Sequence, residues 1–256
     1  MSNHMCAERH RLVIGRNVVE FGAGAGVPGL VAGVLGGRKV VLTDYPSPEL
    51  LRNLEDNVRE NARTHIGLQE RVVVQGHVWG KACEDVLMHL QAGEASGSHQ
   101  STSASASASA WTPPNPPSST TTATTSLMTT TTPDHDPSPN LDLSKFQTLL
   151  LSDLIFNHSQ HIPLLRSLER LIDPANGVAL VFHSHHLPQH RARDLRFFEL
   201  AEKRGWIVEK VVEEVRGVQF VDDLGDVGLR ERVWGREMRW DGVVREETSD
   251  DEDEGE

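Results

Sequence analysis

The sequence is poor in cysteine and has no long apolar run. Its 256 residues include two cysteines, Cys6 and Cys83, which are too few for a disulfide framework. No stretch approaches the roughly 20 apolar residues that span a bilayer, and none resembles a secretory leader. These absences argue against a disulfide-rich secreted protein and against a membrane protein. We therefore expect a protein of a reducing compartment, the cytoplasm, with no membrane partner.

A basic surface is also lacking. The formal net charge is −12, and eight of the carboxylates lie in residues 246–256, so the rest of the chain carries −4. Proteins whose main affinity is for nucleic-acid phosphates have a basic face, and we therefore expect no nucleic-acid partner. Residues 242–256 are interpreted as a disordered, solvated acidic tail.

Apolar residues are nearly absent from one internal segment. Residues 93–143 are dominated by serine, threonine and proline, and Trp111 is their only large aromatic residue. Such a composition buries too little apolar surface to offset the entropy of ordering, which predicts a disordered insertion. It separates the two predicted halves of one domain, residues 1–92 and 144–241.

Those halves alternate apolar runs with amphipathic stretches, the pattern of βαβ units. The fold class we expect is α/β, a Rossmann-like sheet of seven mostly parallel strands with helices on both faces. The predicted strands are Asn17–Phe21, Lys39–Thr43, Arg71–Gln75, Phe146–Ser152, Val178–His183, Trp206–Val215 and Arg232–Trp240. The predicted helices are Val27–Gly36, Pro48–His65, Lys81–Gln91, Ser159–Ile172 and Pro188–Arg204, and residues 1–16 have room for one or two helical turns.

The stretch VVEFGAGAGVPG combines the first strand with a glycine turn and the start of a helix. Helix N–H groups that point into such a turn make a nucleotide site at the carboxyl end of a strand. The turn fits G-x-G-x-x-G, and Asp44 follows the second strand, so an NAD site is one reading. Glu20 lies directly below the turn, where a charge would oppose a pyrophosphate and suit a cationic ligand. S-adenosylmethionine is the other reading, and the one that we favour.

Five motifs in this order resemble a known family: VVEFGAGAGVPG, VVLTDYP, NLEDNVREN, GHVWG and LLLSDLIFNHSQH. They are similar to the seven-strand S-adenosylmethionine-dependent methyltransferases of the lysine-methyltransferase type, in particular the fungal nicotinamide N-methyltransferase-like group. The resemblance covers Asn17–Trp240 apart from the insertion. It implies methylation of the N-terminus and an adjacent lysine of translation elongation factor 1-alpha, by a monomer.

The resemblance also implies roles for particular residues. The implied and predicted cofactor-binding residues are Glu20, Gly22, Ala23, Gly24, Gly26, Asp44, Asn57, Trp79 and Ser152. Asp44 would accept the ribose hydroxyls and Trp79 would stack beside the adenine. The implied catalytic residues are Asp153, Phe156 and Asn157, which would orient the acceptor amine near the cofactor. Family members also carry a segment before the first strand that closes the cofactor pocket. Only 16 residues precede Asn17 here, so we expect either that the sequence is truncated or that the cofactor is held in a more open pocket.

Three other readings remain open. One is a methyltransferase acting on free nicotinamide, the second an NAD-dependent oxidoreductase, and the third an inactive methyltransferase-like protein that binds partners. Six histidines invite a metal reading, but no cysteine or acid cluster completes a site, and methyl transfer needs no metal, so we expect none. These residues are His158, His161, His183, His185, His186 and His190.

Overall fold

The computed structural model describes residues 1–91, 141–185, 187–215, 228 and 231–243. The predicted acidic tail from residue 244 and all but the last three residues of the predicted insertion lie outside these residues. The same is true of Trp111. The boundaries proposed for these segments stay predictions.

Seven strands form one sheet in the order β3-β2-β1-β4-β5-β7-β6. All neighbours are parallel except β7, which runs antiparallel to both β5 and β6. The Rossmann-like, mostly parallel fold predicted from the sequence is therefore confirmed. The strands are β1 Asn17–Phe21, β2 Lys39–Asp44, β3 Val72–Gly76, β4 Thr148–Ser152, β5 Val178–His183, β6 Trp206–Val215 and β7 Arg232–Trp240.

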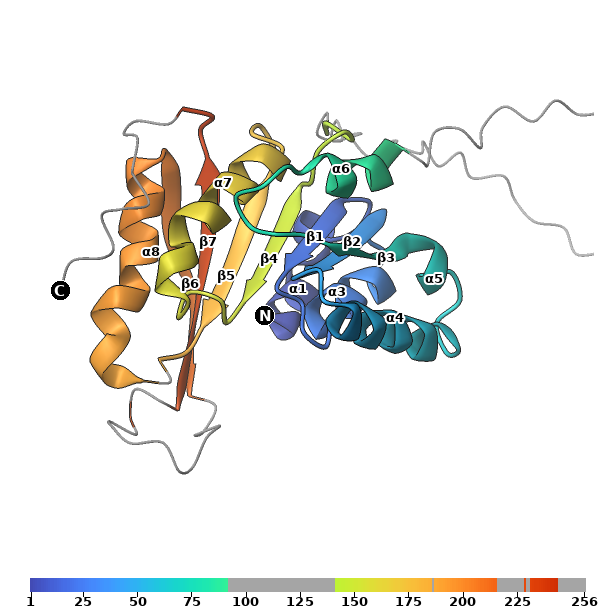
Figure 1. Ribbon diagram of the computed structural model, residues 1–256, viewed down its shortest axis with the longest axis horizontal. Helices are drawn as coiled ribbons and strands as arrows, with labels where there is room; N and C mark the ends of the chain where they lie inside the picture. The colour runs from blue at the N-terminus through green and yellow to red at the C-terminus, as the bar shows by residue number, and fades with distance from the viewer. Residues whose placement is uncertain (92–140, 186, 216–227, 229–230, 244–256) are drawn as a thin grey trace, which may run out of the picture.

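Helices cover both faces of the sheet. The bounds are α1 Ser2–Ala7, α2 Arg9–Leu12, α3 Val27–Val34, α4 Pro48–Ala62, α5 Leu68–Arg71, α6 Glu84–Gln91, α7 His161–Leu171 and α8 Arg191–Lys203, with short 3-10 turns η1 His158–Gln160 and η2 Pro188–His190. In Figure 1, α8 lies beside β6 and β7, and α4 and α5 lie beside β2 and β3.

Alternate residues of the central strands supply two apolar cores, as the period of a strand requires. Val19 and Phe21 of β1 pack with α6, α7 and α8, whereas Val18 packs with α1 to α5. All of β1 and β5 is buried, which explains why their residues are mainly apolar. Strand β6 is an edge strand and is mostly exposed.

Several predicted boundaries are off by a few residues. Helix α4 ends at Ala62 rather than His65, and α3 ends at Val34 rather than Gly36. The short helix α5 is missing from the prediction, and it occupies Arg71, where the third strand was expected to begin. The predicted helix Ser159–Ile172 is divided into η1 and α7, because its first turn is a 3-10 turn.

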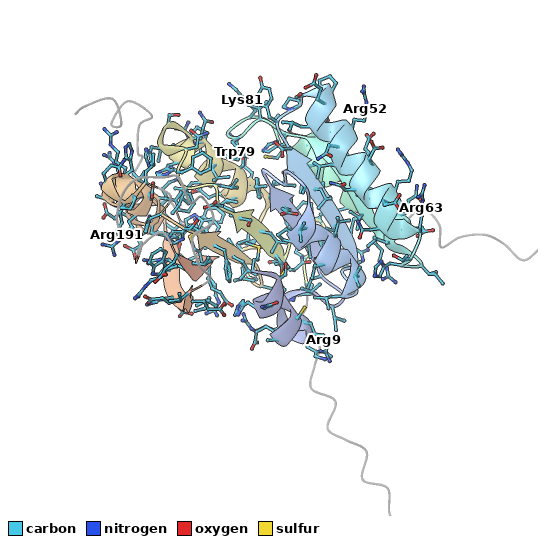
Figure 2. All side chains as sticks on the ribbon, turned by 90° about the horizontal axis from the view of Figure 1, so that it is seen from below. Arg9, Arg52, Arg63, Trp79, Lys81 and Arg191 are labelled. Atoms are coloured by element: carbon cyan, nitrogen blue, oxygen red, sulfur yellow. The ribbon has the colours of Figure 1, made fainter. Side chains whose placement is uncertain are left out.

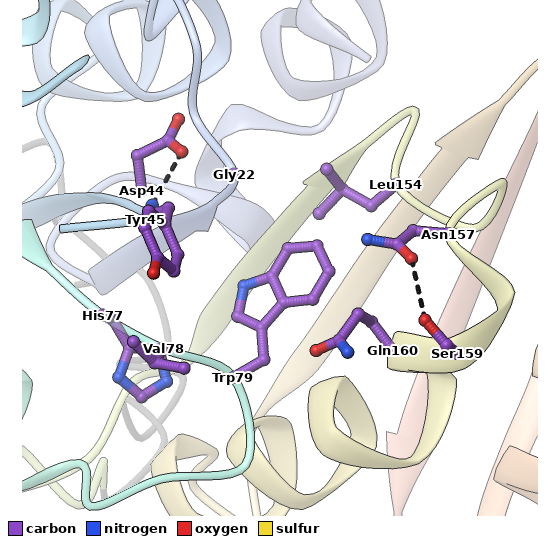
Figure 3. Close-up of a pocket in the computed structure, with 10 residues that line it drawn as sticks. All are labelled: Gly22, Asp44, Tyr45, His77, Val78, Trp79, Leu154, Asn157, Ser159 and Gln160. Carbon is purple, nitrogen blue, oxygen red and sulfur yellow. Dashed lines mark hydrogen bonds between the residues drawn. The ribbon is translucent and has the colours of Figure 1, made fainter. Parts of the chain in front are cut away.

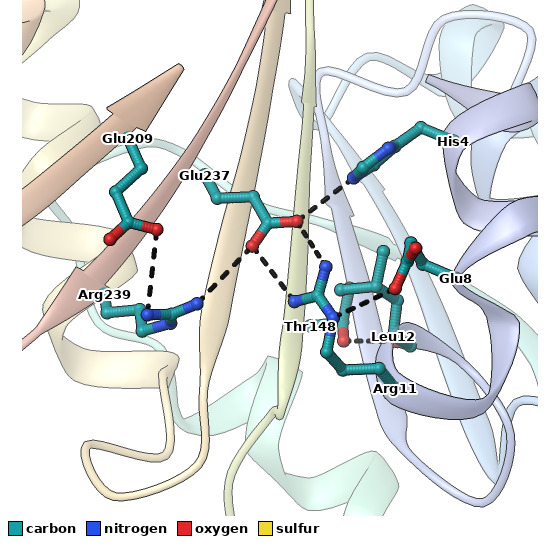
Figure 4. A network of polar contacts seen from close by, with 8 residues as sticks. All are labelled: His4, Glu8, Arg11, Leu12, Thr148, Glu209, Glu237 and Arg239. Carbon is teal, nitrogen blue, oxygen red and sulfur yellow. Dashed lines mark hydrogen bonds and ion pairs between the residues drawn. The ribbon is translucent and has the colours of Figure 1, made fainter. Parts of the chain in front are cut away.

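The N-terminal helices are tied to the far half of the sheet. Glu237 of β7 is 3% exposed and accepts hydrogen bonds from Arg11 Nη1 and Nη2, at 3.0 and 2.7 Å, while His4 Nε2 lies 3.0 Å from its Oε1 (Figure 4). Met5 and Leu12 beside them are fully buried. Met5 and Leu12 thus anchor this segment in the core. None of the described helices combines the length and apolarity that crossing a membrane requires.

Candidate functional site

The glycine turn lies at the carboxyl end of β1 and uses backbone angles that favour glycine. Gly22, Gly24 and Gly26 have φ of 52°, 55° and 74°. A Cβ on Gly22 would lie 2.7 Å from Leu154 Cδ2 and 3.4 Å from Trp79 Cζ2, whereas one on Gly24 would meet nothing within 4 Å. The turn is therefore closely packed at Gly22 and open at Gly24, where a ligand can approach the backbone.

Asp44 ends β2 opposite this turn and is bonded to it. Its Oδ2 accepts a hydrogen bond from Gly24 N at 2.8 Å, and its Oδ1 accepts one from Tyr45 N at 2.7 Å. Each carboxylate oxygen has a second lone pair. The two oxygens are thus fixed in direction and can accept two vicinal hydroxyls.

Asn57 of α4 supports the turn from behind. Its Nδ2 donates to Ala25 O at 3.0 Å. The backbone of Ala23 is held by a bond from its N–H to Thr43 O at 2.9 Å, and Gly26 N donates to Ala23 O at 2.7 Å. Asn57, Ala23 and Gly26 therefore shape the turn.

Glu20 lies below the turn, as predicted, but its surroundings favour the neutral form. It is 1% exposed, and its Oε2 accepts a hydrogen bond from Gly29 N at 2.8 Å. Burial raises its pKa to about 8, against the opposite effect of that hydrogen bond. At pH 7 the free chain therefore carries little negative charge here. This corrects the electrostatic argument for a cationic ligand, which assumed a charged Glu20.

Replacing Glu20 with Gln is expected to stabilise the protein increasingly as pH rises. A folded pKa of about 8 against an ordinary 4.5 means that the folded state binds more protons between these values, so wild-type stability falls as pH rises through them. E20Q does not titrate and keeps an oxygen for Gly29 N–H. Its gain over wild type should grow from near zero at pH 4.5 to a few kcal/mol at pH 8, at about 1.4 kcal/mol per pKa unit.

Urea unfolding of the free protein at several pH values measures this effect. The exposed carboxylate of Glu49 in α4 provides the matched control, E49Q, whose unfolding should follow the wild type at every pH. Parallel curves for E20Q and wild type would show that Glu20 is ionised in the fold.

Trp79 lies in the loop after β3, to which two side chains of α7 are hydrogen-bonded. Ser167, which is fully buried, places its Oγ 2.9 Å from His77 Nε2 and accepts a hydrogen bond from Gly80 N at 2.8 Å. Arg170 Nη1 donates to Gly80 O at 3.0 Å and to Lys81 O at 2.7 Å. Burial lowers the pKa of His77, so its imidazole stays neutral. The loop thus presents Trp79 in a fixed position.

Removal of the Ser167 hydroxyl should loosen this loop. S167A leaves His77 and Gly80 N–H without their buried partner, and we expect the free energy of unfolding to fall by about 1–3 kcal/mol. Chemical denaturation measures the loss. S159A, which removes an exposed hydroxyl near the start of α7, should change stability by less than about 0.5 kcal/mol. Equal effects of the two substitutions would contradict the role of Ser167.

These elements enclose a cavity of about 560 Å³ (Figure 3). Trp79 lies near its centre, with Asp44 and Tyr45 on one side and Leu154 and Asn157 on the other. In Figure 2, which views the molecule from below, Trp79 lies between α4, which carries Arg52, and α8, which begins at Arg191. The lining residues are Gly22, Asp44, Tyr45, His77, Val78, Trp79, Leu154, Asn157, Ser159 and Gln160.

Four of the predicted site residues therefore line this cavity, namely Gly22, Asp44, Trp79 and Asn157. Sequence reasoning missed Tyr45, His77, Val78, Leu154, Ser159 and Gln160. Each of them lies within eight residues after the end of β2, β3 or β4. Because parallel strands end at one edge of the sheet, where ligands bind, these positions could have been predicted as candidates.

Ser152 and Asp153 lie elsewhere, in a smaller cavity of about 190 Å³ beside the ends of β4 and β5. Phe182, Ser184 and Val233 are among its other lining residues. Asp153 has φ of 59°, the one positive value found among the described non-glycine residues. Phe156 lines neither cavity and is 58% exposed. The predicted catalytic residues are thus neighbours in one loop but face different surroundings.

The larger cavity suits a nucleoside. It offers a paired acceptor for ribose hydroxyls at Asp44 and a flat ring at Trp79, and the backbone of Gly22 borders it. In contrast, the described residues include no group of three or more His, Cys, Asp or Glu side chains placed to hold a metal ion.

Comparisons with known proteins agree with this geometry. Residues 3–92 match a family model described as lysine methyltransferase. The chain is 34% identical over 245 residues to a protein N-terminal and lysine N-methyltransferase EFM7 of Cryptococcus neoformans, covering 89% of this chain and 64% of that protein. It is 31% identical over 224 residues to the Schizosaccharomyces pombe efm7 protein of the same description, covering 87% of this chain and 68% of that protein.

Among solved structures, a precorrin-6y C5,15-methyltransferase from Geobacter metallireducens superposes with a TM-score of 0.50. The two chains are 11% identical, and the match covers 93% of this chain and 86% of the other. Such a likeness supports the fold alone. The chain spans less than two thirds of the length of the Cryptococcus relative that it matches.

Proposed function

We propose that this chain, which belongs to the fungal family of protein N-terminal and lysine N-methyltransferases, transfers a methyl group from S-adenosylmethionine to an amino group of a protein. The observation that carries this proposal is the cavity between the glycine turn and Trp79, with Asp44 bonded to the turn. It accommodates the adenosyl part of the cofactor, with the ribose on Asp44 and the base beside Trp79.

When bound, S-adenosylmethionine supplies a methyl carbon on a sulfonium, which the nitrogen lone pair attacks as the carbon–sulfur bond breaks and its electron pair stays on sulfur. The residues of this chain need only bind, orient and exclude water. Alignment of this kind supplies roughly 7–11 kcal/mol of a barrier. Asp153 and Asn157 lie on the loop after β4 and offer oxygen acceptors for the N–H groups of an amine.

An α-amino group is the easier acceptor. Its pKa of about 8 leaves a share neutral at physiological pH, whereas a lysine near ~10.4 must first lose a proton. We further propose elongation factor 1-alpha as the protein acceptor, on its N-terminus and the adjacent lysine, and the cytoplasm as the location. This finer proposal rests on the resemblance of the motifs. We also propose that the protein is a monomer.

The test is incubation of the purified protein with labelled S-adenosylmethionine and elongation factor 1-alpha, followed by mass spectrometry of the N-terminal peptide. We expect 14-Da increments, one for each methyl group, on the α-amino group and the nearby lysine. No added mass at these positions would refute the proposed acceptor. Free nicotinamide in a parallel reaction examines the small-molecule alternative, and its methylation at a higher rate would favour that reading.

The antiparallel β7 is the specific observation against an NAD-dependent oxidoreductase. A dinucleotide-binding sheet has six parallel strands in the order 3-2-1-4-5-6. Here β7 is inserted between β5 and β6 and runs against both. The glycine pattern is shared by the two classes, but the sheet order is not.

A further inference from the structure

The loop that follows β4 is held in a strained conformation. We call residues 153–158 the acceptor loop, since they include Asp153 and Asn157. Asp153 has φ of 59° and is therefore in the left-handed region. A residue with a side chain is less stable in this region, so the surrounding contacts must hold it there. Its backbone N–H donates to Phe182 O at 2.7 Å, and Ser184 N donates to its Oδ1 at 3.3 Å. The end of β5 thus fixes the beginning of the loop.

A buried carboxylate fixes the other end of the loop. Asp194, in the first turn of α8, is 4% exposed. His158 Nε2 donates to its Oδ1 at 2.8 Å, and His185 Nδ1 donates to its Oδ2 at 2.6 Å. Asp194 therefore joins the last residue of the acceptor loop to the segment after β5. Burial would raise the pKa of Asp194, but the hydrogen bonds from His185 and His158 outweigh it, and the pKa lies below its ordinary value.

Aromatic contacts hold both imidazoles in place. The His185 ring centroid lies 4.8 Å from that of Trp234, and His158 stacks on His190 at 5.9 Å with an interplanar angle of 13°. His161 adds a second bond to the loop through Nε2, which donates to Ile155 O at 2.7 Å. Neither Asp194 nor His185 lines either cavity. They act on the loop and do not contact a ligand.

We propose that Asp194 is a positioning residue for methyl transfer, which through His158 holds the acceptor loop against the segment after β5, so that Asn157 faces the acceptor amine beside the cofactor cavity. This inference rests on the proposed function. A loop displaced by 1 Å costs on the order of 100-fold in rate, because the attacking nitrogen leaves its line of approach. The acceptor loop contributes Leu154 and Asn157 to the lining of the cofactor cavity, whereas Asp44 and Trp79 lie on other elements, so cofactor affinity should change far less than the rate.

The experiment compares D194A, H158A and H158Q with wild type in two measurements. The first is hydrogen exchange of the backbone amides of residues 153–160 in the free protein. We expect the exchange rates of these amides to increase at least tenfold in D194A and H158A, and the exchange rates of amides in α4 to stay unchanged. The second is steady-state methylation of elongation factor 1-alpha, where kcat should fall 10- to 100-fold and the Kd of S-adenosylmethionine should stay within twofold. H158Q keeps an amide nitrogen in place of Nε2 and should recover most of both losses.

E199A, which removes an exposed carboxylate from the same helix, is the matched control and should behave as wild type. Unchanged exchange in D194A would overturn the positioning role whatever the activity. Increased exchange with unchanged kcat would reduce Asp194 to a structural residue and also overturn it. If the wild type transfers no methyl group to any protein amine, the proposed function fails and this inference fails with it. The two failures can be distinguished, because hydrogen exchange reports on the loop contacts of Asp194 without requiring methyl transfer.

Discussion

Replacement of Asp44 by Ala is expected to raise the dissociation constant of S-adenosylmethionine by about 100-fold or more. Each hydrogen bond to a charged group is worth about 1.5–3 kcal/mol, and 1.4 kcal/mol corresponds to a factor of ten. D44A removes two acceptors for ribose hydroxyls. It also releases the N–H groups of Gly24 and Tyr45, so the turn loses its anchor to β2. Equilibrium dialysis with labelled cofactor measures the change.

Two further variants make the result specific. D44N keeps one oxygen acceptor and should lose less affinity than D44A. D56A removes an exposed carboxylate on α4 that pairs only with exposed Arg59, and it should bind the cofactor as wild type does. If D44A and D56A bound equally well, Asp44 would not hold the ribose, and the assignment of the cavity would have to be abandoned.

Replacement of Arg11 by Met is expected to destabilise the fold by about 3 kcal/mol. Breaking a buried ion pair costs about 3–5 kcal/mol because it leaves an uncompensated charge. Glu237 is such a charge, with a side chain 4% exposed, and Arg11 bonds to both of its oxygens. We place the loss at the lower end because the Arg11 side chain is 42% exposed, and because His4 and Arg239 remain 3.0 and 3.8 Å from the Glu237 carboxylate. Denaturant unfolding near pH 7 measures it.

The role of Arg11 should also change how the free energy of unfolding depends on pH. Burial would raise the pKa of Glu237, but the hydrogen bonds from Arg11 and His4 outweigh it, and the pKa lies below its ordinary 4.5. Such a carboxylate stabilises the fold above pH 4.5, and this contribution is lost as pH falls through the lowered pKa. In R11M only His4 and the more distant Arg239 still lower this pKa, so the acid dependence should weaken. The double variant R11M/E237M should regain most of the lost stability. If the stability of R11M depended on pH as that of wild type does, the ion pair of Arg11 and Glu237 would not stabilise the fold as described.

The sheet could be predicted because its pattern is local. The buried strands β1 and β5 are mainly apolar, and four of seven strands have the predicted bounds. The glycines of residues 22–26 marked the site because their positive φ angles favour glycine. Asp44 was within reach because it ends a strand at the edge where the glycine turn lies, whereas Trp79 came from the resemblance of the motifs.

Other features depend on contacts between distant segments, which no local pattern encodes. The neutral form of Glu20 results from complete burial beneath α3, and its partner Gly29 is nine residues away. Asp194 looks like an ordinary helix residue in the sequence. Only the fold brings it to His158, 36 residues earlier in the chain. The same holds for Glu237 and Arg11, which are 226 residues apart.

The central claim is that the cavity beside the glycine turn binds S-adenosylmethionine, and titration calorimetry with the purified protein tests it most directly. Separate titrations with S-adenosylmethionine, NAD and NADP at one pH and salt concentration give comparable affinities. Our account predicts saturable binding of S-adenosylmethionine, weakened by D44A and not by D56A, and no measurable heat with either dinucleotide. Tight binding of NAD or NADP without binding of S-adenosylmethionine would contradict it.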